Sequence, residues 1–169
     1  MHNKITSIEE YAFAGCSRFD SIDIPWDCEI IGSRAFSHCV NLQYLNINAQ
    51  SIRIDPLAFY KCENLIEVNL LGANRIGYKA FSNCDRLEYI TLGNELKTIS
   101  NHAFENCRSL ISVIIPQSVT NIGEFAFAQC NNLVEVEIEN ANANIGDNAF
   151  CHCDALLNVD LGNQIATIG

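Results

Sequence analysis

The stretch IGEFAFAQCNNLVEVEI, residues 122–138, recurs along the whole chain and decides the fold. Its Ala-Phe pair returns every 22 or 23 residues, at Phe13, Phe36, Phe59, Phe81, Phe104, Phe127 and Phe150. Repeats of this length are typical of solenoids, in which a unit buries its apolar side only by stacking on its neighbours. The sequence therefore predicts seven repeats that form one domain over residues 1–169, as part of a longer array.

Several other positions repeat in step with the Phe. An Ile precedes it by five residues, a Leu (Phe19 in the first repeat) follows by six, and two apolar residues follow by nine and eleven. A Cys follows three residues later, at Cys16, Cys39, Cys62, Cys84, Cys107, Cys130 and Cys153. The apolar pair predicts a short strand with one face inward. Identical strands one repeat apart pair in parallel, because each chain turn runs the same way.

The segment between the conserved Ile and the Cys predicts a short helix. The residue after the Ile is mostly of a type favoured at helix N-caps, namely Glu9, Gly32, Asp55, Gly77, Ser100, Gly123 and Gly146. Pro56 suits the first helical position. The Ala and the Cys are four residues apart and would share one helix face.

These repeated positions resemble the BspA-like, or Treponema pallidum-type, leucine-rich repeat, whose motif is I-x-x-I-G-x-x-A-F-x-x-C-x-x-L-x-x-V-x-I-P. Ile122-Gly123, Ala126-Phe127, Cys130, Leu133, Val136 and Ile138 fit it, and Pro25 and Pro116 keep its strand-ending proline. The resemblance covers essentially the whole chain. It implies an α/β repeat solenoid, a right-handed leucine-rich-repeat coil with a parallel β-sheet and short helices.

The resemblance also implies adhesion or ligand binding by a cell-surface or secreted protein. An intracellular location is the alternative, because the N-terminus has no apolar signal stretch and the cysteines are expected to be reduced. The two ends share one motif phase, with Ile5 and Ile8 matching Ile165 and Ile168. This matching favours a second function, that of a structural spacer stacking end to end with further repeats or chains.

The charge of the chain excludes one class of partner. Twenty acidic and ten basic residues give a net charge of −10, and no Lys or Arg follows Arg108. Nucleic-acid binding needs clustered basic residues, so we expect none. No apolar run is long enough to insert into a membrane.

The residues that could carry chemistry are scattered, and we expect no enzyme activity, metal or cofactor. The histidines His2, His38, His102 and His152 cannot converge on one nucleophile, given their places in the repeat. Cys151-His152-Cys153 resembles a metal-binding fragment but has no second Cys pair. The periodic cysteines and Cys28 are expected to be core residues.

The outward positions of the predicted strands vary, whereas the inward ones repeat. We expect a ligand-binding face there, comprising Tyr44, Asn46, Glu67, Asn69, Leu71, Tyr89, Thr91, Ile114, Glu135 and Glu137. Exposed tyrosines are common interface anchors, and the acids favour a basic protein, with a glycan as the other ligand class. The alternative is a solvent-exposed face with scattered residues and no ligand.

Overall fold

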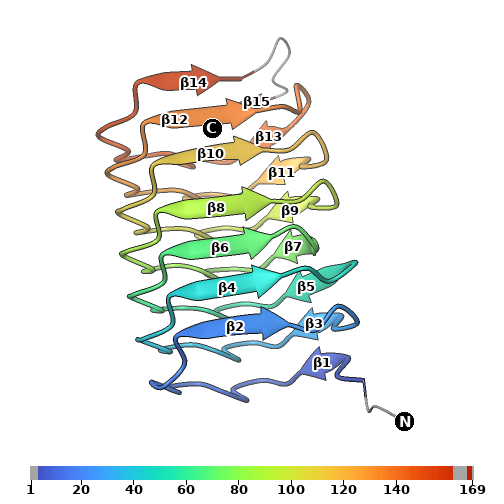
Figure 1. Ribbon diagram of the computed structural model, residues 1–169. Coiled ribbons are helices and arrows are strands. Elements are labelled where there is room, and N and C mark those ends of the chain that lie inside the picture. The colour runs from blue at the N-terminus through green and yellow to red at the C-terminus, as the bar shows by residue number, and fades with distance from the viewer. Residues whose placement is uncertain (1–3, 162–166, 169) are drawn as a thin grey trace.

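The computed structural model describes residues 4–161 and 167–168 and shows a stack of parallel-strand coils (Figure 1). Each coil gives one strand of two to four residues to a first wall and one strand of three or four residues to a second wall. The first wall is an eight-stranded sheet, β1 (Ser7–Ile8), β3 (Ile30–Ile31), β5 (Ile52–Ile54), β7 (Ala73–Ile76), β9 (Thr98–Ile99), β11 (Asn121–Ile122), β13 (Asn144–Ile145) and β15 (Thr167–Ile168).

The second wall consists of two sheets, which the long arrows of Figure 1 show. One sheet contains β2 (Ser21–Ile24), β4 (Tyr44–Ile47), β6 (Glu67–Leu70) and β8 (Tyr89–Leu92). The other contains β10 (Ser112–Ile115), β12 (Glu135–Ile138) and β14 (Asn158–Asp160). Equivalent residues pair in parallel one repeat apart, as Val113 does with Val136, which confirms the predicted parallel solenoid.

The predicted short helices are wrong. Among the described residues no helix is present, and the segments before the Cys are runs of turns. Each such segment has two residues with positive φ, four apart, such as His102 at 58° and Asn106 at 62°. Between them, the N–H of Phe104 donates to the carbonyl of Ala126 on the next coil, at 2.7 Å. A helix needs that N–H for the carbonyl four residues earlier, so bonding between coils replaces it.

The predicted N-caps are wrong for the same reason. Glu9, Gly32, Asp55, Gly77, Ser100, Gly123 and Gly146 begin turns instead of helices. The N–H of Gly123 donates to the Ile99 carbonyl at 2.8 Å, and its own carbonyl accepts from Ala126 at 3.2 Å. Pro56 does not start a helix either, and its carbonyl accepts the Arg34 N–H of the preceding coil at 3.1 Å.

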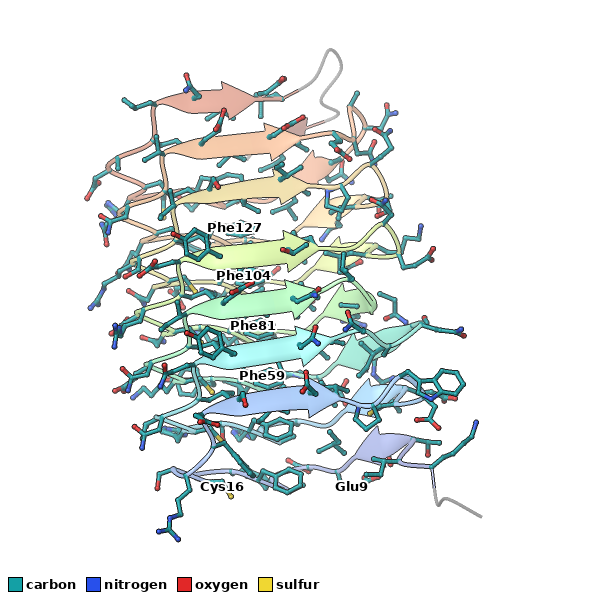
Figure 2. The ribbon with its side chains drawn as sticks, viewed as in Figure 1. Glu9, Cys16, Phe59, Phe81, Phe104 and Phe127 are labelled. Atoms are coloured by element: carbon teal, nitrogen blue, oxygen red, sulfur yellow. The ribbon has the colours of Figure 1, made fainter. Side chains whose placement is uncertain are left out.

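Stacked rings form the centre of the core. Phe59, Phe81, Phe104 and Phe127 lie one above another (Figure 2), with neighbouring centroids 5.1–5.3 Å apart and planes within 9° of parallel. Burial of each such ring stabilises the fold by several kcal/mol. Because a Phe occupies this position in every coil, the ring stack sets the length of the repeat. The repeated residues predicted to face inward do so, except that the end coils, and Ile90 and Leu92 in a central coil, are partly open to solvent.

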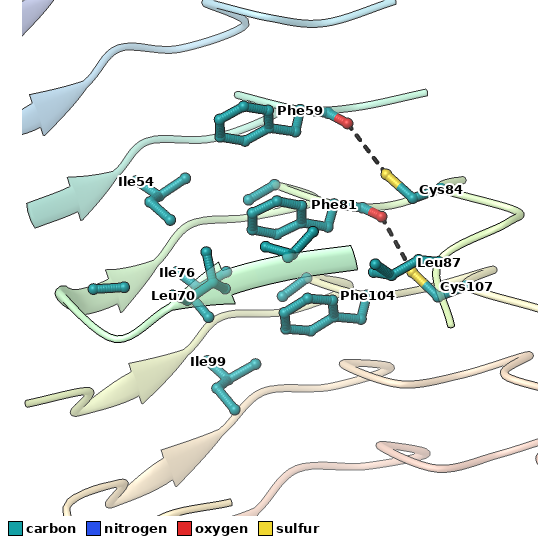
Figure 3. Packing of buried hydrophobic residues seen from close by; sticks show 14 of the residues in the cluster. Ile54, Phe59, Leu70, Ile76, Phe81, Cys84, Leu87, Ile99, Phe104 and Cys107 are labelled. Carbon is teal, nitrogen blue, oxygen red and sulfur yellow. Dashed lines mark hydrogen bonds between the residues drawn. The ribbon is translucent and has the colours of Figure 1, made fainter. Parts of the chain in front are cut away.

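The periodic cysteines lie beside the ring stack as core residues. Their thiols donate to the Phe carbonyl of the preceding coil, and Figure 3 shows two such bonds, Cys84 to Phe59 at 3.4 Å and Cys107 to Phe81 at 3.3 Å. Burial raises the pKa of Cys39 to about 11 and that of Cys107 well above its ordinary value. Cys28 is buried as predicted, and all nine thiols are free.

Candidate functional site

The outward face of the second wall carries the residues predicted to bind a ligand. Tyr44, Tyr89 and Ile114 are 49%, 52% and 57% exposed, although each is large and apolar in its greater part. The register places Glu67 between Tyr44 and Tyr89 on adjacent strands. Two aromatic side chains are therefore presented to solvent on either side of a carboxylate, by a rigid sheet.

The predicted amides on this face are less available. Asn46 donates to Asp23 at 3.0 Å on the neighbouring strand, and Asn69 accepts the N–H of Leu71 at 3.1 Å. Both amides are half-buried. Asn69 thereby fixes the main chain at Leu71, which is itself exposed, and both amides are less accessible than the exposed side chains of this face.

The acidic side of the face lies on β12. Glu135 and Glu137 are exposed and have no hydrogen-bond or ion-pair partner within the described part of the chain. The register pairs them with Ser112 and Ile114 of β10. Two unneutralised carboxylates therefore point outward beside an exposed apolar residue, which suits a basic group on a ligand.

The two sheets of the second wall meet at β8 and β10 without a hydrogen-bonded ladder. Pro116, which follows β10, explains part of this break, because it has no N–H to donate. On the next coil Glu139 occupies the same position and donates its N–H to Ile115 at 3.0 Å. Before the strands, Ile111 still donates to Glu88 at 3.3 Å, so the coils stay in contact.

A groove of about 290 Å³ follows this break. Its apolar lining comes from Ile90, Leu92, Ile114 and Pro116, and Glu139 lies at its edge. Ile90 and Leu92 are only half-buried, whereas the equivalent residues of the neighbouring coils are fully buried. The sequence predicts Ile114 in the site but not Ile90 or Leu92, because both fit the inward column. Pro116 is the feature of the sequence that could have indicated the break between β8 and β10 and the groove beside it.

The face therefore divides into two parts. Tyr44, Glu67, Leu71, Tyr89 and Thr91 lie on or beside β4, β6 and β8, and Glu135 and Glu137 lie two coils further along. The groove separates these parts, and Ile114 lies at its edge between them. A ligand that contacts both parts must cross the groove.

His38 and His102 lie in different coils and have separate neighbours. His102 stacks on Phe125 at 5.1 Å, and its Nδ1 lies 3.2 Å from Glu105 Oε2 in a poor orientation for hydrogen bonding. His38 packs edge-on against Tyr60 near the other end of the stack. Within the described ranges no group of three His, Cys, Asp or Glu could hold a metal ion. His2 lies outside the described residues.

Residues 4–161 and 167–168 contain no helix long and apolar enough to cross a bilayer.

The fold and its exposed face define a repeat solenoid with two flat, parallel-stranded walls. The family described as "BspA type Leucine rich repeat region (6 copies)" matches residues 1–74 and 71–169. The chain therefore belongs to the BspA-type leucine-rich repeat family, as the motif predicts.

Solved structures show the same fold. The leucine-rich repeat protein of T. pallidum, TpLRR, is 29% identical with a TM-score of 0.84, and the match covers 93% of this chain and 74% of TpLRR. A leucine-rich repeat protein from Eubacterium ventriosum is 31% identical with a TM-score of 0.66, covering 73% of this chain and 34% of that protein. This chain thus spans about a third of the Eubacterium protein.

A more distant likeness is limited to the fold. The pneumococcal vaccine antigen PcpA is 19% identical with a TM-score of 0.53, covering 90% of this chain and 59% of that one. No curated protein matches the chain.

Proposed function

We propose that the chain is a non-catalytic interaction module that binds a basic segment of a protein partner across the outward face of β4–β12. The carrying observation is the groove at the β8–β10 break, flanked by exposed Tyr89 on one side and by unpaired Glu135 and Glu137 on the other. Apolar lining with acidic edges suits a segment that alternates apolar and basic side chains. Family membership supports an adhesion role.

A protein ligand is favoured over a glycan on this face. Its two central amides are engaged within the sheet, and four of the eight residues that line the groove are apolar. Sugars need many free hydrogen-bonding groups, whereas peptide side chains fill aliphatic grooves. We also propose a cell-surface or secreted location on the basis of the family, since burial protects most of the thiols whatever the compartment.

The experiment is a selection of phage-displayed random peptides on the immobilised protein. We expect enriched peptides that combine aromatic or aliphatic residues with Lys or Arg and that fail to bind a Tyr89→Ala, Glu137→Gln variant. The matched control is Tyr78→Ala, which removes an exposed tyrosine from the opposite wall. Enrichment of peptides that bind the Tyr89→Ala, Glu137→Gln variant equally well would contradict this site.

A second candidate function is end-to-end assembly, and one observation favours it. The N-terminal coil has an apolar groove of about 540 Å³, lined by Ile5, Phe13, Phe19 and Ile22 among others. Leu157 is highly exposed at the other end. Sedimentation velocity over a concentration range tests this: growth of the species with concentration supports stacking, and a constant monomer contradicts it.

A further inference from the structure

We infer that the first wall carries a separate site for an oligosaccharide, with neutral sugar units near Trp26 and one acidic unit at Arg75. Two grooves, of about 630 and 550 Å³, lie on this wall across β3, β5, β7 and β9. Arg53 lines both grooves, so they adjoin. The site lies on the wall opposite the protein-binding face and does not depend on it.

Exposed aromatic side chains mark the two ends of this surface. Trp26 lines the first groove and is 59% exposed, and Tyr78 lines the second and is 44% exposed. The electron-rich face of such a ring attracts the polarised C–H bonds of a sugar. A lysine already lies over one face of each ring, Lys4 at 4.8 Å from the Trp26 centroid and Lys79 at 5.7 Å from the Tyr78 centroid, so a sugar would stack on the other face. Trp26 precedes β3 and Tyr78 follows β7, two coils apart, or about 10 Å along the stack from the usual strand spacing. Their separation suits a short oligosaccharide lying diagonally across the strands.

Polar groups between the aromatic rings have unused hydrogen-bonding capacity. The side-chain amide of exposed Gln50 has no partner within the described residues. Asn74 donates to Ser51 Oγ at 2.8 Å and keeps its carbonyl oxygen unpaired there. Sugar hydroxyls, which both donate and accept, match such a mixed set.

The charges place the acidic unit at one end. Arg53 is held by Asp55, with Nε and Oδ1 2.7 Å apart, and Lys4 lies 3.7 Å from Asp27. Arg75 is exposed and has no hydrogen-bond or ion-pair partner among the described residues, so its guanidinium is available to an anion. In the Trp26 groove Glu29 is an unpaired acid, which disfavours a second anionic unit there.

The experiment uses Trp26, the single tryptophan of the chain, as the reporter. The intact protein is titrated with neutral, uronate-containing and sulfated oligosaccharides, and tryptophan emission and heat of binding are recorded. We expect saturable changes with the acidic oligosaccharides, and the uronate and sulfate series then identify the anion. Arg75→Ala should weaken that binding at least about 10-fold, as should Tyr78→Ala. Tyr89→Ala, on the opposite wall, is the matched control and should leave it unchanged.

Three results would overturn the inference. The first is the absence of a saturable signal with every oligosaccharide. The second is binding of neutral and acidic oligosaccharides with equal affinity, unaffected by Arg75→Ala. The third is unchanged binding in a Gln50→Ala, Tyr78→Ala variant whose circular dichroism and thermal unfolding match the parent. Because peptide binding at the other wall is measured separately, this outcome is independent of the proposed protein-binding function.

Discussion

The thiol of Cys107 donates a hydrogen bond to the main-chain carbonyl of Phe81, 3.3 Å away and 26 residues earlier. The same bond links coil to coil from Cys39 to Cys153. A buried carbonyl needs a donor, and Cys supplies one while still packing as a small hydrophobe. The carbonyls of Phe13, Phe36, Phe59 and Phe104 also accept the main-chain N–H of the Cys three residues later, whereas at Phe81 the thiol of Cys107 is the donor that Ala or Val would remove.

Replacing Cys107 with Ala should destabilise the fold by about 1–3 kcal/mol, because a buried carbonyl loses its donor and a small cavity is left. Urea unfolding measures the change. The control is Cys151→Ala, off the ladder and partly exposed, which should cost less than about 0.5 kcal/mol. Equal losses for the two variants would show that the thiol bond contributes nothing.

The buried thiols should make the protein sensitive to alkaline pH. Burial raises the pKa of Cys39 from 9.0 to about 11, and that of Cys62 is also raised. A raised folded-state pKa gives stability that is complete below pH 9 and is lost as pH rises toward the folded value. We expect unfolding free energy to fall between pH 9 and 11, by about 1.4 kcal/mol per pH unit for each such thiol.

The measurement is urea unfolding at several pH values in reducing buffer. Cys39→Ala should reduce the slope above pH 9 relative to the parent, since one titrating thiol is gone. A parent slope that Cys39→Ala leaves unchanged would contradict the assignment.

Gly93→Ala should disrupt the turn after β8. A Cβ on Gly93 would overlap the carbonyl oxygen of Leu71 on the preceding coil, and main-chain atoms cannot rotate away. The loss should exceed about 2 kcal/mol in thermal or urea unfolding. Gly15→Ala is the contrasting variant: it has open space but a φ of 72°, so its loss should be about 1 kcal/mol. A smaller loss for Gly93→Ala than for Gly15→Ala would contradict the close packing.

Charge on β12 should govern how fast a basic partner associates. Glu135→Gln with Glu137→Gln removes two exposed, unpaired carboxylates. We expect a lower association rate for a selected basic peptide and a weaker dependence of that rate on salt, with dissociation less affected. Surface plasmon resonance from low to high salt checks this. The control pair Glu63→Gln and Glu95→Gln lies outside this acidic cluster and should change the rate less.

The sequence predicts the inward-facing repeated positions well, because each of them is buried in every coil and therefore carries an apolar residue in every repeat. Phe104, Cys107 and Leu110 are all buried as expected. The helix error came from a spacing that fits two structures. Ala126 and Cys130 are four apart, which suits one helical turn and equally a run of turns.

The hydrogen bond from the N–H of Phe104 to the carbonyl of Ala126 decides in favour of the run of turns over a helix. It joins two coils, so the sequence of a single repeat does not reveal it. Leu57 and Phe125 adopt positive φ although their residue types rarely do, so the residue types give no consistent indication. The outward columns identified the exposed tyrosines and Ile114 as surface residues. The groove beside Ile114 was missed because it depends on how β8 and β10 fail to pair, a property of two coils together.

The most direct test of the proposed function is the affinity of a selected peptide for the Tyr44→Ala, Tyr89→Ala double variant, measured by isothermal titration calorimetry beside the parent and Tyr78→Ala. Both tyrosines of the double variant are exposed, so the fold should persist, which circular dichroism verifies. We predict an affinity loss of at least about 10-fold for the double variant, with Tyr78→Ala unchanged. Equal affinity of the parent and a folded double variant would contradict the assignment of this face as the binding site.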